Sequence, residues 1–371
     1  MTPNDLCRIA KRLMRHPTAP FHEHAIREEV ERICAENGLQ HRRDSFGNLL
    51  IQSKKGRAGR PIVLAAHLDH PGFEIVRRLS STHWKVKFCG GVPDRYFRRG
   101  TALRLMPGNT PAKLGTAHGD RSFEIVAHST VSAAPRFAVW DLSAFQARNG
   151  RIFGRACDDL IGAASVLATL IDLQGSPGPF HVIGVLSRAE EIGFRGALAV
   201  AATKTLPRNS LVVSLETSRE LPEARMGSGV VLRVGDRTSI FSSEAMRFLG
   251  EVAAALQTQN RQFRFQRALM SGGTCEATAY QEYGLETAAV CVPLGNYHNC
   301  GTRNRIAAEY VSVRDVCDMV DLLIAAARSM SKYAHIVSRL PHRLHVLCRE
   351  SQSRLIRTRD GEGSAQMPRS E

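Results

Sequence analysis

The chain repeats one local pattern: a short apolar run that ends in polar residues, followed by a longer segment with helical spacing of apolar side chains. The apolar runs cover residues 61–69, 181–191, 211–218 and 286–295. Helical spacing covers residues 21–36, 160–173, 243–259 and 311–330. Strands that alternate with helices in this way form a parallel sheet with helices packed on its faces. The pattern therefore predicts an α/β fold, a three-layer sandwich with a mostly parallel central sheet.

One segment interrupts this alternation. Residues 73–150 contain short alternating stretches such as FEIVRRL and HWKVKFC, separated by Gly, Pro, Asn and Asp, and no helical pattern. Such a segment predicts a small β-rich barrel or sandwich inserted into the α/β domain. We therefore expect a discontinuous catalytic domain at 1–72 and 151–332, an inserted domain at 73–150 and a basic extension at 333–371. The extension loses clear periodicity, and its end, RTRDGEGSAQMPRSE, is expected to be disordered.

Composition and charge narrow the class of protein. Hydrophobic residues make up 43% and charged residues 23%, as in an ordinary globular protein. No apolar run reaches the ~18 residues that span a bilayer, and the N-terminus lacks a signal-peptide pattern, so we expect a cytoplasmic protein with no membrane association. The net charge is +15, but the basic residues are dispersed, which makes nucleic acid an unlikely partner. Nine scattered cysteines without CxxC pairs favour reduced thiols.

Histidine and acidic side chains fall at the ends of the apolar runs. Ligands of open α/β sheets gather at the carboxyl ends of the strands, so we expect these side chains to meet if the strands share a sheet. Two histidines and several carboxylates, with no thiolate required, suit Zn²⁺, Mn²⁺ or Co²⁺. The candidate residues are His67, Asp69, Asp158, Asp159, Glu190, Glu191, Glu216 and His298.

This inventory is sufficient for a pair of ions. One carboxylate can bridge both, and each ion then takes one histidine and one further carboxylate. Such a pair lowers the pKa of a shared water and stabilises the oxyanion of an attacked amide, and a spare carboxylate must move the proton. The adjacent Glu190 and Glu191 can serve as ligand and proton acceptor. His67 and Asp69 would point to the same face of a strand, so Asp69 could accept the second imidazole N–H.

Each group also has a simpler explanation. A lone histidine at a strand end is more often structural than a metal ligand. An Asp-Asp pair before an apolar helix is usually a helix N-cap, and a Glu-Glu pair is usually a solvated face. Glu216 in an apolar strand is harder to explain, because an unpaired buried acid is costly. Together, in this order and each at a strand end, these residues favour the metal site.

The order of motifs resembles metallopeptidase family 42, the dinuclear aminopeptidases that include glutamyl-aminopeptidases and tetrahedral (TET) aminopeptidases. The matching elements are HxD, a β-rich insertion, DDxxG, EEIGxRGA, an acid two residues before a Ser or Thr, GGT and a late histidine. In this chain they stand at residues 67–69, 73–150, 158–162, 190–197, 216, 272–274 and 298. The resemblance spans about residues 1–330. It implies a zinc-exopeptidase-like fold in which the insertion is a dimerisation domain, with dimers that often assemble into tetrahedral dodecamers.

The resemblance also implies roles for the candidate residues around two divalent ions per chain, with Zn²⁺ preferred and Co²⁺ or Mn²⁺ as alternatives. The implied ligands are Asp158 as the bridge, His67 and Glu216 on one ion, and Glu191 and His298 on the other. Glu190 would be the general base and Asp69 would orient His67. Asp159 would lie behind the ligands, after a cis peptide bond that joins it to Asp158.

Four positions depart from the family pattern. Glu216 stands where the family usually has Asp, and Leu160 stands where it has Arg or Asn. Cys275 follows GGT in place of Asp, with Glu276 next, and His298 lies in the unusual context NYHN. All the implied metal ligands are therefore present, whereas the residues expected to form the substrate pocket differ from those of the family.

These residues predict a metal-dependent aminopeptidase that acts on short peptides, and the resemblance implies that it forms a homo-oligomer. One alternative is an N-acyl amino-acid deacylase or carboxypeptidase with the same metal site, which Glu216 and Cys275 slightly favour. In those sibling families, however, the extra domain follows the acid equivalent to Glu216 rather than preceding it. A second alternative is a non-catalytic assembly protein of the same fold, which would be favoured by a lost ligand or base, and none is lost.

Overall fold

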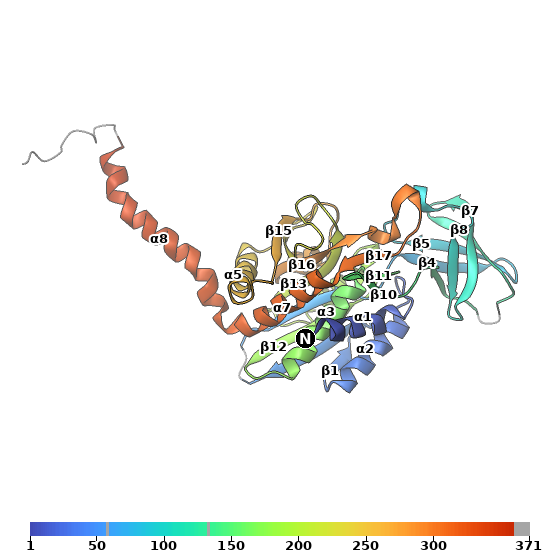
Figure 1. The fold of residues 1–371 in the computed structure, drawn as a ribbon, viewed down its shortest axis with the longest axis horizontal. Helices are drawn as coiled ribbons and strands as arrows, with labels where there is room; N and C mark the ends of the chain where they lie inside the picture. The colour runs from blue at the N-terminus through green and yellow to red at the C-terminus, as the bar shows by residue number, and fades with distance from the viewer. Residues whose placement is uncertain (57–58, 132–133, 360–371) are drawn as a thin grey trace, which may run out of the picture. The chain divides into compact units, whose positions relative to one another are not determined.

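A computed structural model describes residues 1–56, 59–131 and 134–359 of the chain. Met1–Ser331 form one compact unit, and the residues from Lys332 onward form a second. The first unit contains an 11-stranded sheet and a closed barrel, which lies at one end of the sheet (Figure 1).

Four parallel strands form the centre of the large sheet, in the order β12-β3-β13-β16. They are β3 (Ile62–His67), β12 (Phe180–Ser187), β13 (Leu211–Arg219) and β16 (Glu286–Gly295). Every residue of β3 is buried, as expected for a strand covered on both faces. These are the four apolar runs identified in the sequence, and their carboxyl ends lie at the same edge of the sheet. The α/β fold predicted from the sequence is thus confirmed.

Shorter strands extend the sheet on both sides of this centre, and most of them pair antiparallel. They are β1 (Gln40–Arg43), β2 (Leu49–Lys55), β10 (Gln146–Arg148), β11 (Arg151–Gly154), β14 (Val230–Gly235), β15 (Phe265–Leu269) and β17 (Glu309–Ser312). The sheet is therefore mixed, with a parallel core and antiparallel flanks.

Helices cover both faces of the large sheet (Figure 1). They are α1 (Pro3–Met14), α2 (His24–Glu36), α3 (Leu160–Gln174), α4 (Arg195–Ala202), α5 (Ser243–Gln259), α6 (Glu276–Glu282) and α7 (Val313–Ser329). α3 packs against β3, β12 and β13, and α1 and α7 pack against α3. On the opposite face, α4 and α6 form an apolar cluster with alternate residues of the central strands, such as Val63 and Ala65. Gly184 of β12 leaves room for α3, because a Cβ there would lie 2.9 Å from Val166 and Leu170.

The closed barrel follows β3 directly in the chain. Its strands are β4 (Gly72–Arg78), β5 (His83–Cys89), β6 (Ala102–Met106), β7 (Thr110–Gly119), β8 (Ser122–Ala127) and β9 (Phe137–Trp140). Aromatic rings fill its interior, with Phe73 at centroid distances of 4.8 Å from Phe88 and 5.0 Å from Trp140. The chain returns to the large sheet at β10, so the barrel is an insertion between β3 and β10. This agrees with the inserted β-barrel that the sequence predicted as part of the fold.

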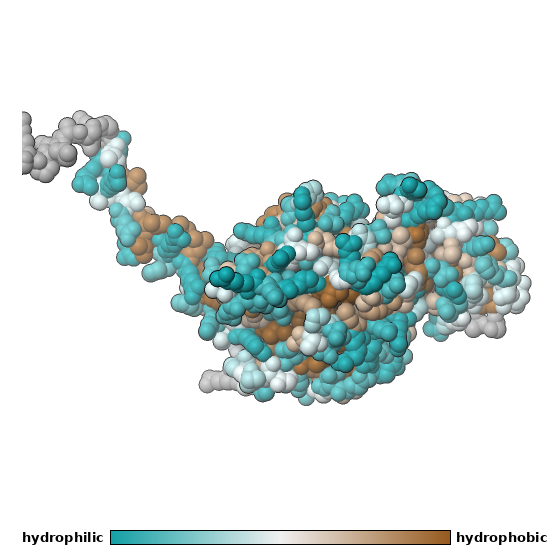
Figure 2. Space-filling view, in the orientation of Figure 1, coloured by the Kyte–Doolittle hydropathy of each residue, from teal (hydrophilic) through white to brown (hydrophobic). Residues whose placement is uncertain are grey.

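The second unit contains the helix α8 (Tyr333–Arg357), where the sequence showed no clear periodicity. Apolar side chains such as Leu340, Leu344 and Leu347 are exposed along it, and Figure 2 shows brown apolar residues among teal polar ones on its surface. The segment expected to be disordered begins at Arg357, and residues 360–371 of it lie outside the described residues. Among the helices described, none has the length and apolar character needed to cross a membrane.

Candidate active site

The eight candidate residues lie together at the carboxyl edge of the parallel strands. His67 ends β3, Glu216 lies near the end of β13, and Asp158 and Asp159 directly precede α3. Glu190 and Glu191 begin the short helix η2 (Glu190–Ile192) after β12, and His298 lies in η3 (Tyr297–Asn299) after β16. The peptide bond between Asp158 and Asp159 is cis.

The Asp158 carboxylate lies between the two histidines. Its Oδ1 is 3.4 Å from Nε2 of His67, and its Oδ2 is 3.5 Å from Nε2 of His298. His67 Nε2 also lies 4.0 Å from the Glu216 carboxylate, and His298 Nε2 lies 3.3 Å from the Glu191 carboxylate. Both histidines thus face Asp158. Glu191 is the further carboxylate beside His298, whereas His67 has both Glu216 and Glu190 beside it, the latter at 3.9 Å.

Asp69 contacts both the two glutamates and the imidazole of His67. Its carboxylate accepts hydrogen bonds from the backbone N–H groups of Glu190 and Glu191, at 2.9 and 3.1 Å. The Nδ1 of His67 donates to the backbone carbonyl of Asp69 at 3.1 Å, and the Asp69 carboxylate Oδ1 lies 3.5 Å from the same nitrogen.

Several groups that hold the cluster in place were not found from the sequence. The Glu309 carboxylate accepts the backbone N–H groups of Cys157 and Asp158, at 2.8 and 3.1 Å. His70 contacts the Asp158 carbonyl through Nδ1, at 2.6 Å, and the Asn299 side-chain oxygen through Nε2. His70 stands in the AAHLDHPG segment and could have been noted there, whereas Glu309 carries no local signal.

The barrel also contributes to the site. The loop after β5 brings the Gly91 carbonyl to 3.0 Å from Nδ1 of His298. That hydrogen bond leaves Nε2 of His298 facing Asp158 and Glu191, because an imidazole that donates through one nitrogen presents the other to a ligand. The inserted barrel therefore fixes the orientation of one candidate ligand.

Burial and the mutual proximity of these groups change their proton affinities. Burial, with the neighbouring Asp158 carboxylate, raises the pKa of Glu216 to about 8. Burial and nearby carboxylates also raise the pKa of Glu190 well above its usual range. For His67, burial acts in the opposite direction, but the charges of Glu190 and Asp158 prevail and raise its pKa. The cluster therefore crowds acidic groups in a buried place, and a bound cation would favour their charged forms.

The donor set fits divalent cations. His67, Glu190 and Glu216 offer ligand atoms within 4.8 Å of one another, and so do His67, Asp158 and Glu191. Within the described residues, the buried oxygens Asp158 Oδ1 and Glu191 Oε1 have no hydrogen-bond partner, so their lone pairs are open to an ion. Imidazole nitrogens combined with carboxylate oxygens suit zinc and related divalent metals.

A small cavity of about 40 Å³ adjoins Glu216. Its wall includes the segment Gly272–Cys275, in which Cys275 departs from the family pattern. The wall also includes Arg233, which is buried and donates to Ser218 Oγ at 3.1 Å. Tyr297 closes one side and stacks on the His298 ring with centroids 3.8 Å apart. The altered segment thus lies directly beside the cluster.

Comparison with known proteins places this geometry in a family. The sequence profile of the M42 glutamyl aminopeptidases matches residues 129–322, more than half of the chain. The chain belongs to the M42 peptidase family. The peptide-hydrolase class predicted from the sequence is confirmed at this level, as is the resemblance on which it was based.

Solved structures share the M42 fold over almost their whole length. TET1 peptidase of Pyrococcus horikoshii matches with a TM-score of 0.73 and 22% identity, over 87% of this chain and 99% of that one. An aminopeptidase of Desulfurococcus kamchatkensis matches at 0.72 and 19%, over 88% and 95%. A TET aminopeptidase of a marine-sediment Thaumarchaeota archaeon matches at 0.74 and 20%, over 90% and 99%.

Six of the eight candidate residues of this M42 chain lie within the range that the family profile matches. Asp158, Asp159, Glu190, Glu191, Glu216 and His298 fall within residues 129–322, whereas His67 and Asp69 precede it. The structure nevertheless brings His67 to 3.4 Å from Asp158. Folding thus joins the two parts of the cluster.

Proposed function

We propose that the chain is a metal-dependent aminopeptidase that removes N-terminal residues from short peptides at a dinuclear site. The position of Asp158 carries this proposal, because one oxygen of its carboxylate faces His67 and the other faces His298. A carboxylate in that position can bridge two cations. His67 and Glu216 would complete one site, and Glu191 and His298 the other.

Two divalent ions at these residues, with Zn²⁺ preferred and Co²⁺ or Mn²⁺ as alternatives, would supply a water of lowered pKa and polarise the scissile carbonyl. The protein's own part is to hold the ligands and move the proton. Glu190 lies 3.9 Å from His67 Nε2, and its backbone N–H donates to Asp69. Burial raises the pKa of Glu190, which makes its carboxylate a stronger base for accepting a proton that it then donates to the leaving amine. Asp159 accepts the Gly162 N–H at the start of α3 and supports the Asp158 segment.

Hydrolysis of aminoacyl-p-nitroanilides, with N-acetylated amino acids in parallel, tests the proposal. The protein would be reconstituted with Zn²⁺, Co²⁺ or Mn²⁺, and Glu190→Gln would be the control. We expect metal-dependent cleavage of the free-amine substrates that the variant lacks. Activity on the acylated compounds alone would assign the chain to the deacylases. Two bound ions without activity on either set would indicate a non-catalytic role.

We also propose that the chain assembles into a homo-oligomer. The matched structures include a dodecamer and a peptidase that assembles into a tetrahedron or a large octahedral shell. The inserted barrel would serve as the dimerisation domain. Light scattering coupled to size-exclusion chromatography would measure the mass, and a monomer at micromolar concentration would contradict this part of the proposal.

A further inference from the structure

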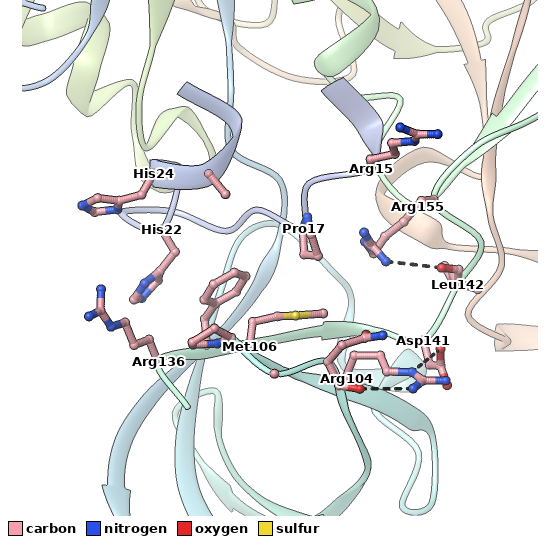
Figure 3. A pocket seen from close by; sticks show the side chains of 16 residues that line it. Arg15, Pro17, His22, His24, Arg104, Met106, Arg136, Asp141, Leu142 and Arg155 are labelled. Carbon is pink, nitrogen blue, oxygen red and sulfur yellow. Dashed lines mark hydrogen bonds and ion pairs between the residues drawn. The ribbon is translucent and has the colours of Figure 1, made fainter. Parts of the chain in front are cut away.

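A large cavity in the structure lies apart from the metal cluster. It has a volume of about 680 Å³, within the range of small-molecule sites. Its walls come from the segment between α1 and α2, from the β6 and β9 strands of the barrel, and from the chain that returns to the large sheet (Figure 3). None of the eight candidate metal-site residues lines it.

The cavity is strongly basic. Figure 3 shows arginines on two sides of it, Arg136 beside the imidazoles of His22 and His24 on one side and Arg15, Arg104 and Arg155 on the other. Asp141 is the acidic residue of the lining, and Arg104 already pairs with it at 2.9 Å. Within the described residues, neither Arg15 nor Arg136 forms an ion pair. The lining therefore presents positive charge that its own carboxylate does not balance.

Arg155 is the most unusual member of the lining. Its side chain is only 8% exposed. Its described side-chain hydrogen bond goes to the backbone carbonyl of Leu142 at 3.3 Å, and it has no ion-pair partner among the described residues. Burial lowers the pKa of Arg155 to about 10. Burying a guanidinium without a carboxylate is costly, so an anion that enters the cavity would offset an existing cost.

Apolar groups lie between the two basic sides. Pro17, Met106 and Phe137 line this part of the cavity. The His22 ring stacks on Phe137 with centroids 4.9 Å apart, and its buried Nε2 has no hydrogen-bond partner among the described residues. A ligand of matching chemistry would combine an acidic group with an apolar body.

We propose that this cavity is a binding site for a small organic anion, a carboxylate, phosphate or sulfonate with an apolar body. Arg155 would hold the charged group, since the guanidinium fork matches the oxygens of such groups. Arg136 lies on the opposite side of the cavity and would add to its positive potential (Figure 3). The apolar body would lie on Met106 and Phe137. The proposal does not depend on peptidase activity, because the site shares no lining residue with the metal cluster.

The test compares two fluorescent probes with the same ring system, 1-anilinonaphthalene-8-sulfonate and the uncharged N-phenyl-1-naphthylamine. We expect the sulfonate to bind the full-length protein saturably, with one site per chain that the neutral probe does not share. Arg155→Met is expected to weaken sulfonate binding about tenfold or more, as expected for a lost charge-assisted contact. Arg136→Gln should weaken it by a smaller factor, and the exposed Arg261→Gln serves as the matched control.

Thermal unfolding separates a binding role from a structural one. If Arg155 is retained for the ligand, Arg155→Met should unfold at a temperature no lower than the wild type and should lose the stabilisation that the sulfonate gives. Arg136 is exposed, so Arg136→Gln keeps the test valid if the buried variant fails to fold. The proposal would be overturned if wild type and Arg136→Gln bind the sulfonate equally well and Arg155→Met either binds it equally well or fails to fold. Equal affinity for both probes would do the same.

Discussion

The adjacent residues Glu190 and Glu191 should respond differently to the same substitution. Glu191 lies 3.3 Å from His298 and belongs to the proposed ligand set, whereas Glu190, 3.9 Å from His67, is the proposed general base. A change to glutamine keeps the shape of either side chain and removes its charge. The backbone N–H groups of both residues would still donate to Asp69, so the local fold should persist. The pair therefore separates proton transfer from metal binding.

Glu190→Gln is expected to lower kcat by about 10²–10⁴, the usual contribution of a general base, which corresponds to ~3–5 kcal/mol of transition-state free energy. Its metal content should stay at two ions per chain. Glu191→Gln should weaken metal binding by at least the ~10–100-fold that loss of an outer partner causes. Metal analysis and p-nitroanilide turnover measure the two effects, with the exposed Glu282→Gln as control. A Glu190→Gln protein that loses metal, or that turns over at nearly the wild-type rate, would refute the assigned roles.

Three further outcomes follow from the structure. Gly295→Ala would place a Cβ 2.1 Å from the Tyr310 ring and should lower the free energy of unfolding by about 1–3 kcal/mol. Gly250→Ala, whose added Cβ would meet nothing within 4 Å, should raise the free energy of unfolding by about 0.4–1 kcal/mol. Urea titration of both variants measures the two changes. Burial, with the charges of His24 and Arg136, lowers the pKa of His22 to about 4 from 6.5. The unfolded chain therefore binds a proton at His22 first, so the wild type should lose stability relative to His22→Phe as the pH falls from 6.5 to 4, and parallel melting curves would show no such divergence if this is incorrect. Because the pKa of Glu216 is raised to about 8, metal binding at pH 7 should release protons, in a number that falls above pH 8; calorimetry in buffers of different ionisation enthalpy counts them, and zero release at pH 7 would contradict the proposed ligand set.

The central strands and main helices could be predicted because each carries its own signal. The expected helices at 160–173 and 243–259 correspond to Leu160–Gln174 and Ser243–Gln259. The flanking strands could not be found in this way. β1 has the sequence QHRR and is exposed throughout, so neither alternation nor apolar content marks it. Its place depends on pairing with β2, a contact that local sequence does not encode.

The proximity of the candidate ligands could be predicted for a similar reason, since strand ends in a parallel sheet share one edge. The groups that hold these ligands in place could not be predicted. Glu309 reaches the amide of Asp158 from 151 residues away, and His298 is oriented by a backbone carbonyl, which no side-chain pattern reveals. The hydrogen bonds from the Glu190 and Glu191 amides to Asp69 could not be predicted either, because they join two segments 121 residues apart in the chain.

Three buried carboxylates perform the same structural task around the cluster. Asp69 accepts two amides of the Glu190 turn, Glu309 accepts two amides before α3, and Glu23 accepts the amides of Phe21 and Ala189. Each joins a loop to a distant element through hydrogen bonds to a charged acceptor, which are stronger than neutral ones. Loops at strand ends lack ladder hydrogen bonds of their own, so these carboxylates supply the rigidity that a site with narrow geometric tolerance requires. Acidic residues near such a cluster therefore fall into two groups, those that face the proposed ions and those that fix the backbone behind them.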